Sequence, residues 1–463
     1  TAAAARAALE TLGPTFVKFG QALANRPDLV GLTLADALRE LQDSMSAFDD
    51  ADARRVIADE LGEARAAKLL AALPPAPIAA ASICQVYRVE PGVLRRGAVA
   101  VKVQRPGVLE TVAADAALAR AAAGWLEGLR GPGGGRLLRP ALVRSVDEFF
   151  SRLYEEFDFV NERANLDAFA ETYGPRSREG KRLGGRVLLP RPLPKYCGRR
   201  VLTMSWVDGA PLMAPGTAAL PASELPLVRF GIRCTLSQLL ETGLMHADPH
   251  AGNILRPPPS RAARWRARLK LPAPRPTLAY IDFGMVSRVP LEVREALVCA
   301  VCLLLYARDV RKVAALFDSL MLMPTSALDT PAKRQEFEAA LQAAADRVLV
   351  YPAGGFAPDT LPSLRFDQLL GELAFLAARF EFQLPPYFLN NARGLATLEG
   401  MALSADPSFD LVRVVYPFAL RRLLADPTSS PLVRDTLWTL VTDDSGAVRP
   451  SKLRALLRDT ALL

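Results

Sequence analysis

Hydrophobic and polar residues alternate along two short stretches in the first quarter of the chain. "ICQVYRV" and "GAVAVKVQ" each place apolar residues at every second position, and Pro91 and Gly92 between them are typical of a turn. Period-two alternation is the pattern of a strand, so the two stretches predict a hairpin. Further strands are predicted at "GRVLLPRPL", "RRVLTMSWV", "NIL" and "TLAYIDFG".

Most of the remaining sequence has helical periodicity. Because 463 residues are too many for one compact core, we expect more than one folding unit. The order of elements predicts an α+β fold in four parts: a helical N-terminal extension (1–72), a small β-rich lobe with inserted helices (73–208), a large helical lobe (209–430) and a helical tail (431–463). Single helices are expected from about 106 to 130 and from about 140 to 173. This order is typical of a bilobal nucleotide-binding fold.

Composition and cysteine usage narrow the class of protein. Half of the residues are hydrophobic and 23% are charged, which is typical of a globular chain. The five cysteines show no paired spacing, and the CxxC of Cys299 and Cys302 lies in the apolar run "EALVCAVCLLLYA". We interpret these two as buried helix residues rather than a redox or metal pair. A reducing compartment without disulfides is therefore expected.

The net charge of +8 is concentrated in one segment. Residues 256–276 carry seven basic side chains and no acid. This distribution argues against a nucleic-acid-binding surface and predicts one solvated basic loop, or a loop that contacts an anionic membrane or a partner. Peripheral membrane attachment through this loop or an amphipathic helix is a hypothesis. No run reaches the ~18–20 apolar residues of a membrane span.

The stretch "HADPHAGN" contains both histidines of the chain. His246 and His250 flank Asp248, Asn253 follows five residues after that aspartate, and "YIDFG" places Asp282 after a hydrophobic strand. An aspartate, an asparagine five positions later and a downstream DFG are the acidic parts of a protein-kinase active site. Asp248 would orient or deprotonate a hydroxyl, while Asn253 and Asp282 would hold Mg²⁺, which prefers oxygen ligands.

Two other interpretations of the histidine stretch remain open. His-x-Asp-x-His could hold zinc as in a hydrolase, but that site needs a third strong ligand and explains neither Asn253 nor the DFG. The stretch could also be a turn with only a structural role.

The cation that a kinase-like site needs is found upstream. Lys102 occupies the centre of the strand "GAVAVKVQ", where its ammonium would point into the cleft toward phosphate oxygens and a helix glutamate. The loop before it reads "IAAASICQVY" instead of the glycine-rich sequence of ordinary kinases. Alanine still lets backbone N–H groups approach phosphate, with less freedom at positive φ.

From about residue 10 to 430 the sequence resembles the UbiB, or aarF-domain, atypical kinases. "KFGQ" is similar to the KxGQ signature of that family, "AAASICQVY" to its alanine-rich loop, and "EFDFVNERAN" to its acidic segment. Glu156 and Asp158 stand at the ExD positions, and Glu162 at the helix glutamate expected to pair with Lys102. "HADPHAGN" and "DFG" complete the series in the right order.

The resemblance implies an ATP- or ADP-binding, Mg²⁺-dependent kinase or ATPase with a bilobal atypical kinase-like fold. It implies that Lys18 and Gln21 face Glu156, Asp158 and the nucleotide, which would gate the site. Asp248 and Lys102 would be catalytic, and Asn253 and Asp282 would be metal ligands. The nucleotide-binding residues would be Ala79, Ala80, Ala81, Ser82, Ile83, Cys84, Lys102, Glu162, Met204 and Val207.

The sequence departs from the family pattern at two positions. Cys84 replaces the usual glycine of the alanine-rich loop, where it would narrow the nucleotide site or make it sensitive to thiol reagents. Ala251 replaces the usual proline of the histidine stretch and would loosen that turn. Neither change removes a catalytic group, so we expect an active site.

"LGPTFVKFGQALANRPDL", "VLTMSWVDG" and "ATLEGMALSADPSF" look most like the plant and algal plastid branch of the family. That branch implies a chloroplast location, at plastoglobules or thylakoids, and a role in prenyl-lipid and quinone metabolism. Because the chain begins without methionine, we expect that an N-terminal address such as a transit peptide has been cut away or left out. Mitochondrial and bacterial origins remain the alternatives, although the bacterial quinone-biosynthesis type is expected to carry a C-terminal span. The alternative function is a nucleotide-gated lipid-binding or scaffolding protein without productive phosphoryl transfer.

Overall fold

The computed structural model divides into two compact units, each formed from separate stretches of the chain. Unit 1 comprises Thr1–Glu171, Leu189–Asp208 and Ile281–Met285, and unit 2 comprises Thr172–Leu188, Gly209–Tyr280 and Val286–Leu463. The structure describes every residue except 1, 25–31, 40, 42–45, 130–141, 214–218, 248–251, 260–264, 266–267, 270–276, 351–361, 365, 381, 383, 427, 429, 443–444 and 461–463.

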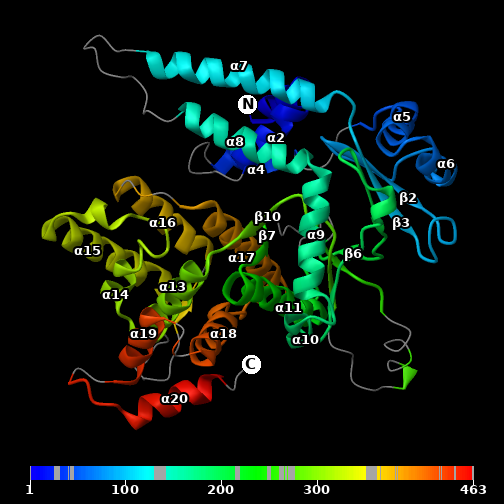
Figure 1. Ribbon diagram of the computed structural model, residues 1–463. Coiled ribbons are helices and arrows are strands. Elements are labelled where there is room, and N and C mark those ends of the chain that lie inside the picture. The colour runs from blue at the N-terminus through cyan, green and yellow to red at the C-terminus, as the bar shows by residue number, and fades with distance from the viewer. Residues whose placement is uncertain are drawn as a thin grey trace. The chain divides into compact units, whose positions relative to one another are not determined.

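Unit 1 combines helices with a small antiparallel sheet (Figure 1). Its strands are β1 (Ala79–Ala80), β2 (Cys84–Val89), β3 (Val99–Gln104) and β5 (Val201–Ser205), in the order β1-β2-β3-β5. Its helices are α1 (Ala2–Leu12), α2 (Pro14–Ala24), α4 (Leu32–Arg39), α5 (Asp50–Leu61), α6 (Glu63–Ala72), α7 (Val108–Gly128), α8 (Leu142–Phe157), the larger part of α9 (Phe159–Tyr173) and the 3₁₀ turn η1 (Pro194–Tyr196).

The predicted hairpin is confirmed as β2 and β3. Cys84 pairs with Gln104 at one end of the ladder and Val89 with Val99 at the other. Gly92 in the turn has φ +93°, a left-handed conformation that glycine adopts without steric cost.

The helix predicted from about 140 to 173 is wrong in one respect, because it consists of α8 and α9 with a break at Asp158. The Asp158 Oδ1 accepts hydrogen bonds from the N–H groups of Val160 (3.0 Å) and Asn161 (3.3 Å). An aspartate that satisfies the first free N–H groups of a helix favours a helix start at that point. The short-range cap therefore interrupts a hydrophobic pattern that runs across the junction.

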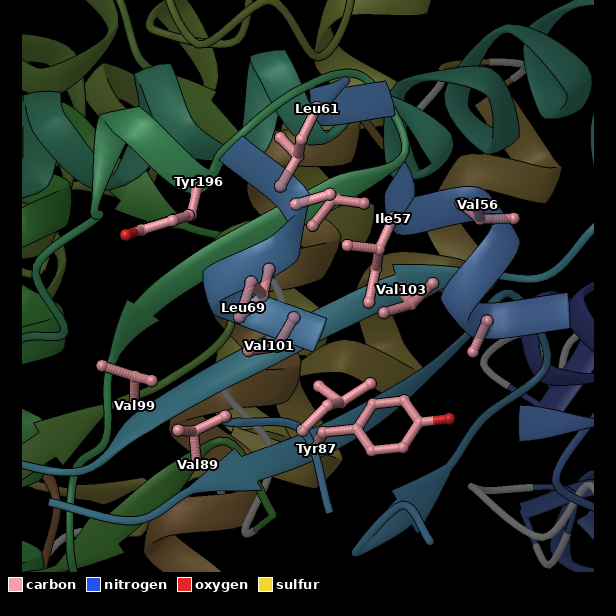
Figure 2. Packing of buried hydrophobic residues seen from close by; sticks show 14 residues of the cluster. Val56, Ile57, Leu61, Leu69, Tyr87, Val89, Val99, Val101, Val103 and Tyr196 are labelled. Atoms are coloured by element: carbon pink, nitrogen blue, oxygen red, sulfur yellow. The ribbon is translucent and has the colours of Figure 1, made fainter. Parts of the chain in front are cut away.

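One face of the unit 1 sheet carries the core, as Figure 2 shows. Ile57 and Leu61 of α5 and Leu69 of α6 pack against Val101 and Val103 of β3, and all five side chains are buried. Each fully buried aliphatic side chain of this size contributes about 1.5–3 kcal/mol. The two helices thereby fix the position of β3.

The opposite face of the same sheet carries the predicted site residues. Because side chains alternate along a strand, Lys102 points away from the face formed by Val101 and Val103. Directly paired residues of antiparallel strands share a face. Register therefore places Cys84, Ala100, Lys102, Leu202 and Met204 on this second face.

Unit 2 is mainly helical, as predicted for the larger lobe, and contains short strands. Its β4, β9, β8 and β6 form one sheet in that order, β7 pairs with β10, and β11 pairs with β12. The strands are β4 (Val187–Leu188), β6 (Ala210–Pro211), β7 (Leu244–His246), β8 (Ile254–Arg256), β9 (Leu278–Tyr280), β10 (Val286–Arg288), β11 (Leu349–Val350) and β12 (Ser363–Leu364). The stretch "GRVLLPRPL" thus forms a regular strand over only two residues.

The helices of unit 2 are α10 (Arg178–Arg182), η2 (Ala222–Glu224), α11 (Leu225–Leu236), the π-helical turn η3 (Ser237–Thr242), α13 (Leu291–Cys302), the π-helical turn η4 (Leu303–Ala307), α14 (Val310–Ala315), η5 (Thr325–Leu328), α15 (Pro331–Val348), α16 (Phe366–Phe380), α17 (Pro386–Ala405), α18 (Val412–Ala425), α19 (Pro431–Val441) and α20 (Pro450–Thr460). Cys299 and Cys302 are buried free thiols in α13, as expected. Across the part of the chain that the structure describes, no helix has the length and apolar character needed to cross a membrane.

Candidate functional site

Lys102 is the centre of a group of charged side chains in unit 1. Its Nζ lies 2.6 Å from the Oε1 of Glu162 and 3.4 Å from the Oδ2 of Asp282. The side chains of Lys102 and Glu162 are 10% and 4% exposed, whereas that of Asp282 is 44% exposed. The structure therefore brings three of the predicted site residues together, one cation between two carboxylates.

The helix α9 positions the two carboxylates of this group. Glu162 lies in the first turn of α9, and its Oε1 also accepts the N–H of Phe283 at 3.4 Å. Asn165 donates from Nδ2 to the Phe283 carbonyl at 3.0 Å, and the Phe169 ring lies 5.0 Å from the Phe283 ring. Glu162, Asn165 and Phe169 occur at i, i+3 and i+7, so they share one face of the helix. That face holds the DFG segment beside Lys102.

Asn165 and Phe169 were not among the residues that the sequence singled out. The stretch "NERANLDAF" does contain their spacing from Glu162. The spacing alone predicts only a common helix face, because it does not show that Phe283 lies against that face.

The electrostatics of the group keep Lys102 charged. Burial works against its charged form, but the carboxylates of Asp282 and Glu162 outweigh burial, so the pKa of Lys102 lies above its ordinary value. Burial also raises the pKa of Glu162, and the Lys102 ammonium opposes this shift. A lysine with a raised pKa keeps its stabilising contribution at every pH below its ordinary value and loses it only above the folded-state pKa. Lys102 is therefore a cation at physiological pH.

Cys84 lies on the same sheet face but is covered by apolar side chains. It belongs to a buried cluster with Phe159 and Leu202. Burial raises the pKa of the Cys84 thiol to about 12, although the nearby Lys102 ammonium acts in the other direction. The thiolate is the reactive form of cysteine, so a raised pKa lowers the reactivity of Cys84. This argues against the expectation that the site is sensitive to thiol reagents.

We predict that iodoacetamide at pH 8 will leave Cys84 unmodified in the folded protein. Its thiol stays protonated below its raised pKa and is shielded from solvent. Peptide mass spectrometry after unfolding in guanidinium should show full modification of the same residue. Labelling of Cys84 in the native protein at the rate found for the unfolded chain would contradict its burial.

The alanine-rich loop forms the end of a hairpin rather than an open loop. Ala79 and Ala80 make up β1, which pairs with β2, and the Ala81 N–H donates to the Cys84 carbonyl at 2.8 Å. Ser82 is buried, and Ile83 is half-buried. Among the other residues predicted to bind nucleotide, Met204 is buried on the Lys102 face and Val207 is half-buried after β5.

The predicted gating residues are connected within unit 1 in different ways. Lys18 of α2 lies 2.5 Å from the Glu156 Oε2 of α8, and these side chains are 21% and 15% exposed. Gln21 donates from Nε2 to the Leu41 carbonyl at 2.9 Å. Asp158 caps α9. The contact between Lys18 and Glu156 therefore joins the KFGQ helix to the acidic segment.

The catalytic loop predicted from "HADPHAGN" belongs to unit 2. Asp248, His250 and Ala251 lie outside the described residues, and Asn253 is half-buried in the turn before β8. His246 lies on β7 and is 2% exposed. Its backbone N–H donates to the Gln238 Oε1 of η3 at 3.0 Å. Of the residues that the structure describes, no three histidine, cysteine, aspartate or glutamate side chains are grouped to hold a metal ion.

Comparison with known proteins gives a family match. Residues 40–317, more than half of the chain, match the ABC1 atypical kinase-like domain. The chain is 36% identical over 461 residues to an uncharacterized protein of Synechocystis sp., covering 98% of this chain and 60% of that protein. It is 36% identical over 459 residues to Protein ACTIVITY OF BC1 COMPLEX KINASE 3, chloroplastic, of Arabidopsis thaliana, covering 96% of this chain and 56% of that protein.

The chain thus spans less than two thirds of the length of these two relatives. A second uncharacterized Synechocystis protein is 32% identical over 440 residues, which cover 93% of this chain and 68% of the relative. The domain match and these relatives confirm the α+β atypical kinase-like fold and the resemblance drawn from the motifs. The chain belongs to the ABC1 atypical kinase-like family, also called the aarF or UbiB family.

Proposed function

We propose that this protein is an ATP- and Mg²⁺-dependent atypical kinase or ATPase that binds nucleotide phosphates on the Lys102 face of the unit 1 sheet. The observation that carries the proposal is the buried contact between Lys102 and Glu162, with Asp282 at 3.4 Å. Burying a lysine and a glutamate costs solvation free energy that apolar residues would not incur. Their presence on a face with a partly exposed carboxylate supports a role in ligand binding.

Each residue of the group has a proposed role. Lys102, oriented by Glu162, would neutralise phosphate oxygens. Asp282 fits a magnesium ligand, because its carboxylate is 44% exposed and carboxylate oxygens suit this hard cation. The Asn253 amide would supply a second oxygen. Bound Mg²⁺ would neutralise the charge on the phosphates, and Asp248 would accept the proton of the attacking hydroxyl or water.

We propose that the KFGQ helix gates this site. The close contact between Lys18 and Glu156 anchors α2 to α8 within unit 1, and both side chains are largely buried. A partly buried ion pair is less screened by salt than an exposed one, so it can hold the helix in one position. Gating by Gln21 and Asp158 rests on the sequence resemblance.

The biological setting is proposed from the relatives and the charge pattern. Chloroplastic and cyanobacterial relatives favour a plastid protein that acts in prenyl-lipid or quinone metabolism at plastoglobules or thylakoids. The seven basic residues of 256–276 support attachment to an anionic membrane surface, and most of this segment lies outside the described residues.

Thermal denaturation with nucleotide tests the proposed function. We predict that ADP or ATP with Mg²⁺ will raise the Tm, and that Asp282→Asn will abolish the part of the shift that depends on Mg²⁺. Ligand at 100 times its Kd stabilises a folded protein by about 2.7 kcal/mol, and each kcal/mol corresponds to about 2–4 °C in a unit of 150–250 residues.

Asp167→Asn is the matched control, because Asp167 is an exposed carboxylate of α9 that pairs with Arg163 on the same helix. This variant should shift like the wild type. Absence of any shift with either nucleotide in the wild type would refute the proposed function. A full Mg²⁺-dependent shift in Asp282→Asn would remove Asp282 from the metal site.

A further inference from the structure

Arg105 holds three successive carbonyl oxygens of the alanine-rich loop. Its backbone N–H donates to the Ile83 carbonyl at 2.9 Å, and its Nε donates to the Ser82 carbonyl at 3.2 Å. Its Nη2 lies 3.3 Å from the Ala81 carbonyl. Arg105 follows directly after β3, so the strand that carries Lys102 also carries the group that fixes the loop.

The direction of these carbonyls determines the direction of the neighbouring amides. In a planar trans peptide the C=O of one residue and the N–H of the next point to opposite sides. Carbonyls turned toward Arg105 therefore turn the N–H groups of Ser82, Ile83 and Cys84 away from it. Within the described part of the chain, the N–H groups of Ser82 and Ile83 donate to no protein acceptor. Such successive amides can receive an anion.

The same guanidinium also contacts the segment that precedes α5. Its Nη2 donates to the Ser46 carbonyl at 2.9 Å, and its Cζ lies 5.2 Å from the centre of the Phe48 ring. The Phe48 N–H in turn donates to the Gln85 Oε1 at 3.1 Å. One arginine therefore joins the loop between β1 and β2 to the segment 46–49, which follows the N-terminal helices in the chain.

We propose that Arg105 is a positioning residue that sets the orientation of the alanine-rich loop and couples it to the segment 46–49. A planar guanidinium can bind several carbonyls at fixed angles, whereas an ammonium acts as a single point charge. The effect on nucleotide affinity rests on the proposed function. The effect on the loop and on segment 46–49 is independent of the proposed function.

Hydrogen exchange tests the structural part with Arg105→Gln, Arg105→Lys and the control Arg96→Gln, which changes an exposed arginine of the β2–β3 turn. We predict that Arg105→Gln will speed exchange of the Ala81 and Phe48 amides about tenfold or more, because charge-assisted hydrogen bonds are lost. Arg105→Lys should give a smaller increase. Arg96→Gln should leave the exchange rates of the Ala81 and Phe48 amides unchanged. The exchange rate of the Val101 amide, at the centre of β3, should be the same in every variant.

Calorimetry with ADP and Mg²⁺ tests the functional part. The Kd should rise about tenfold in Arg105→Gln, less in Arg105→Lys, and not at all in Arg96→Gln. If the wild type binds no nucleotide, the proposed function fails while the exchange experiment still decides the role of Arg105. Unchanged exchange at Ala81 and Phe48 in a folded Arg105→Gln protein would overturn the proposal. If Arg105→Gln does not fold, Arg105→Lys decides the question. Unchanged exchange of the Ala81 and Phe48 amides together with an unchanged Kd in Arg105→Lys would also overturn the proposal.

Discussion

Replacing Lys102 by methionine will destabilise the protein by about 3–5 kcal/mol, the cost of leaving one partner of a buried ion pair uncompensated. Glu162, 4% exposed, would lose the ammonium at 2.6 Å and keep its weaker contact with the Phe283 amide. Asp282 contributes less to this cost because solvent screens its partly exposed carboxylate. Urea denaturation of the wild type and the variant measures the difference.

The destabilisation caused by Lys102→Met will depend on pH with a defined sign. Burial already raises the pKa of Glu162, and removing Lys102 removes the largest opposing influence. The folded variant then binds a proton that the unfolded chain releases near the ordinary glutamate pKa of 4.5. The free energy of unfolding of the variant therefore falls as pH rises from the ordinary glutamate pKa to the raised pKa of Glu162 in the folded variant. The variant should be more stable at pH 6 than at pH 8, relative to the wild type.

The double variant Lys102→Met/Glu162→Met provides the control for this interpretation. With both charges gone, two apolar side chains fill the site, and such replacements are often neutral or stabilising. The double variant should therefore regain most of the lost stability and lose the additional pH dependence. Equal stability of the single and double variants at both pH values would show that Glu162 is not left as a costly buried charge.

The second large effect concerns Asp248. We predict that Asp248→Asn will lower the rate of nucleotide turnover about 10²–10⁴-fold, the usual contribution of a general base, while the Kd for ADP with Mg²⁺ changes less than about twofold. The amide is nearly isosteric with the carboxylate but cannot accept the proton. Phosphate release under saturating nucleotide and calorimetry measure the two quantities.

This experiment separates an enzyme from a nucleotide-gated scaffold. Asp59→Asn, the same change at an exposed position of α5, should leave turnover and binding unaltered. If Asp248→Asn retains both nucleotide binding and full biological function in a strain that depends on the protein, the scaffold function is favoured. Loss of function with binding intact supports phosphoryl chemistry.

The strands that frame the site could be predicted from sequence because their cause is local. Alternation in "GAVAVKVQ" predicts the faces of β3, so the opposite directions of Lys102 and Val101 follow from the residues themselves. The pairing of Lys102 with Glu162, 60 positions apart, was expected only from the family resemblance. No periodicity encodes a contact between two separate elements.

Two other features of unit 1 could not be predicted from the sequence, each for its own physical reason. Arg105 was not among the residues that the sequence singled out, because only the folded hairpin brings the Ser82 and Ala81 carbonyls to its side chain. The break at Asp158 was missed because hydrophobic periodicity continues on both sides of the cap. The roles of the catalytic and metal residues remain predictions.

The discontinuity of unit 1 has a consequence for its biosynthesis. Lys102 and Glu162 leave the ribosome long before Asp282, which is 180 residues after the lysine. At about 5–20 residues per second this interval lasts roughly 10–40 s. During the last two thirds of that interval, after Glu162 has also emerged, the nascent chain can form the buried ion pair and the hairpin, but not the DFG contacts with Asn165 and Phe169. Unit 1 is therefore completed by five residues, Ile281–Met285, which are synthesised after all the other residues of that unit.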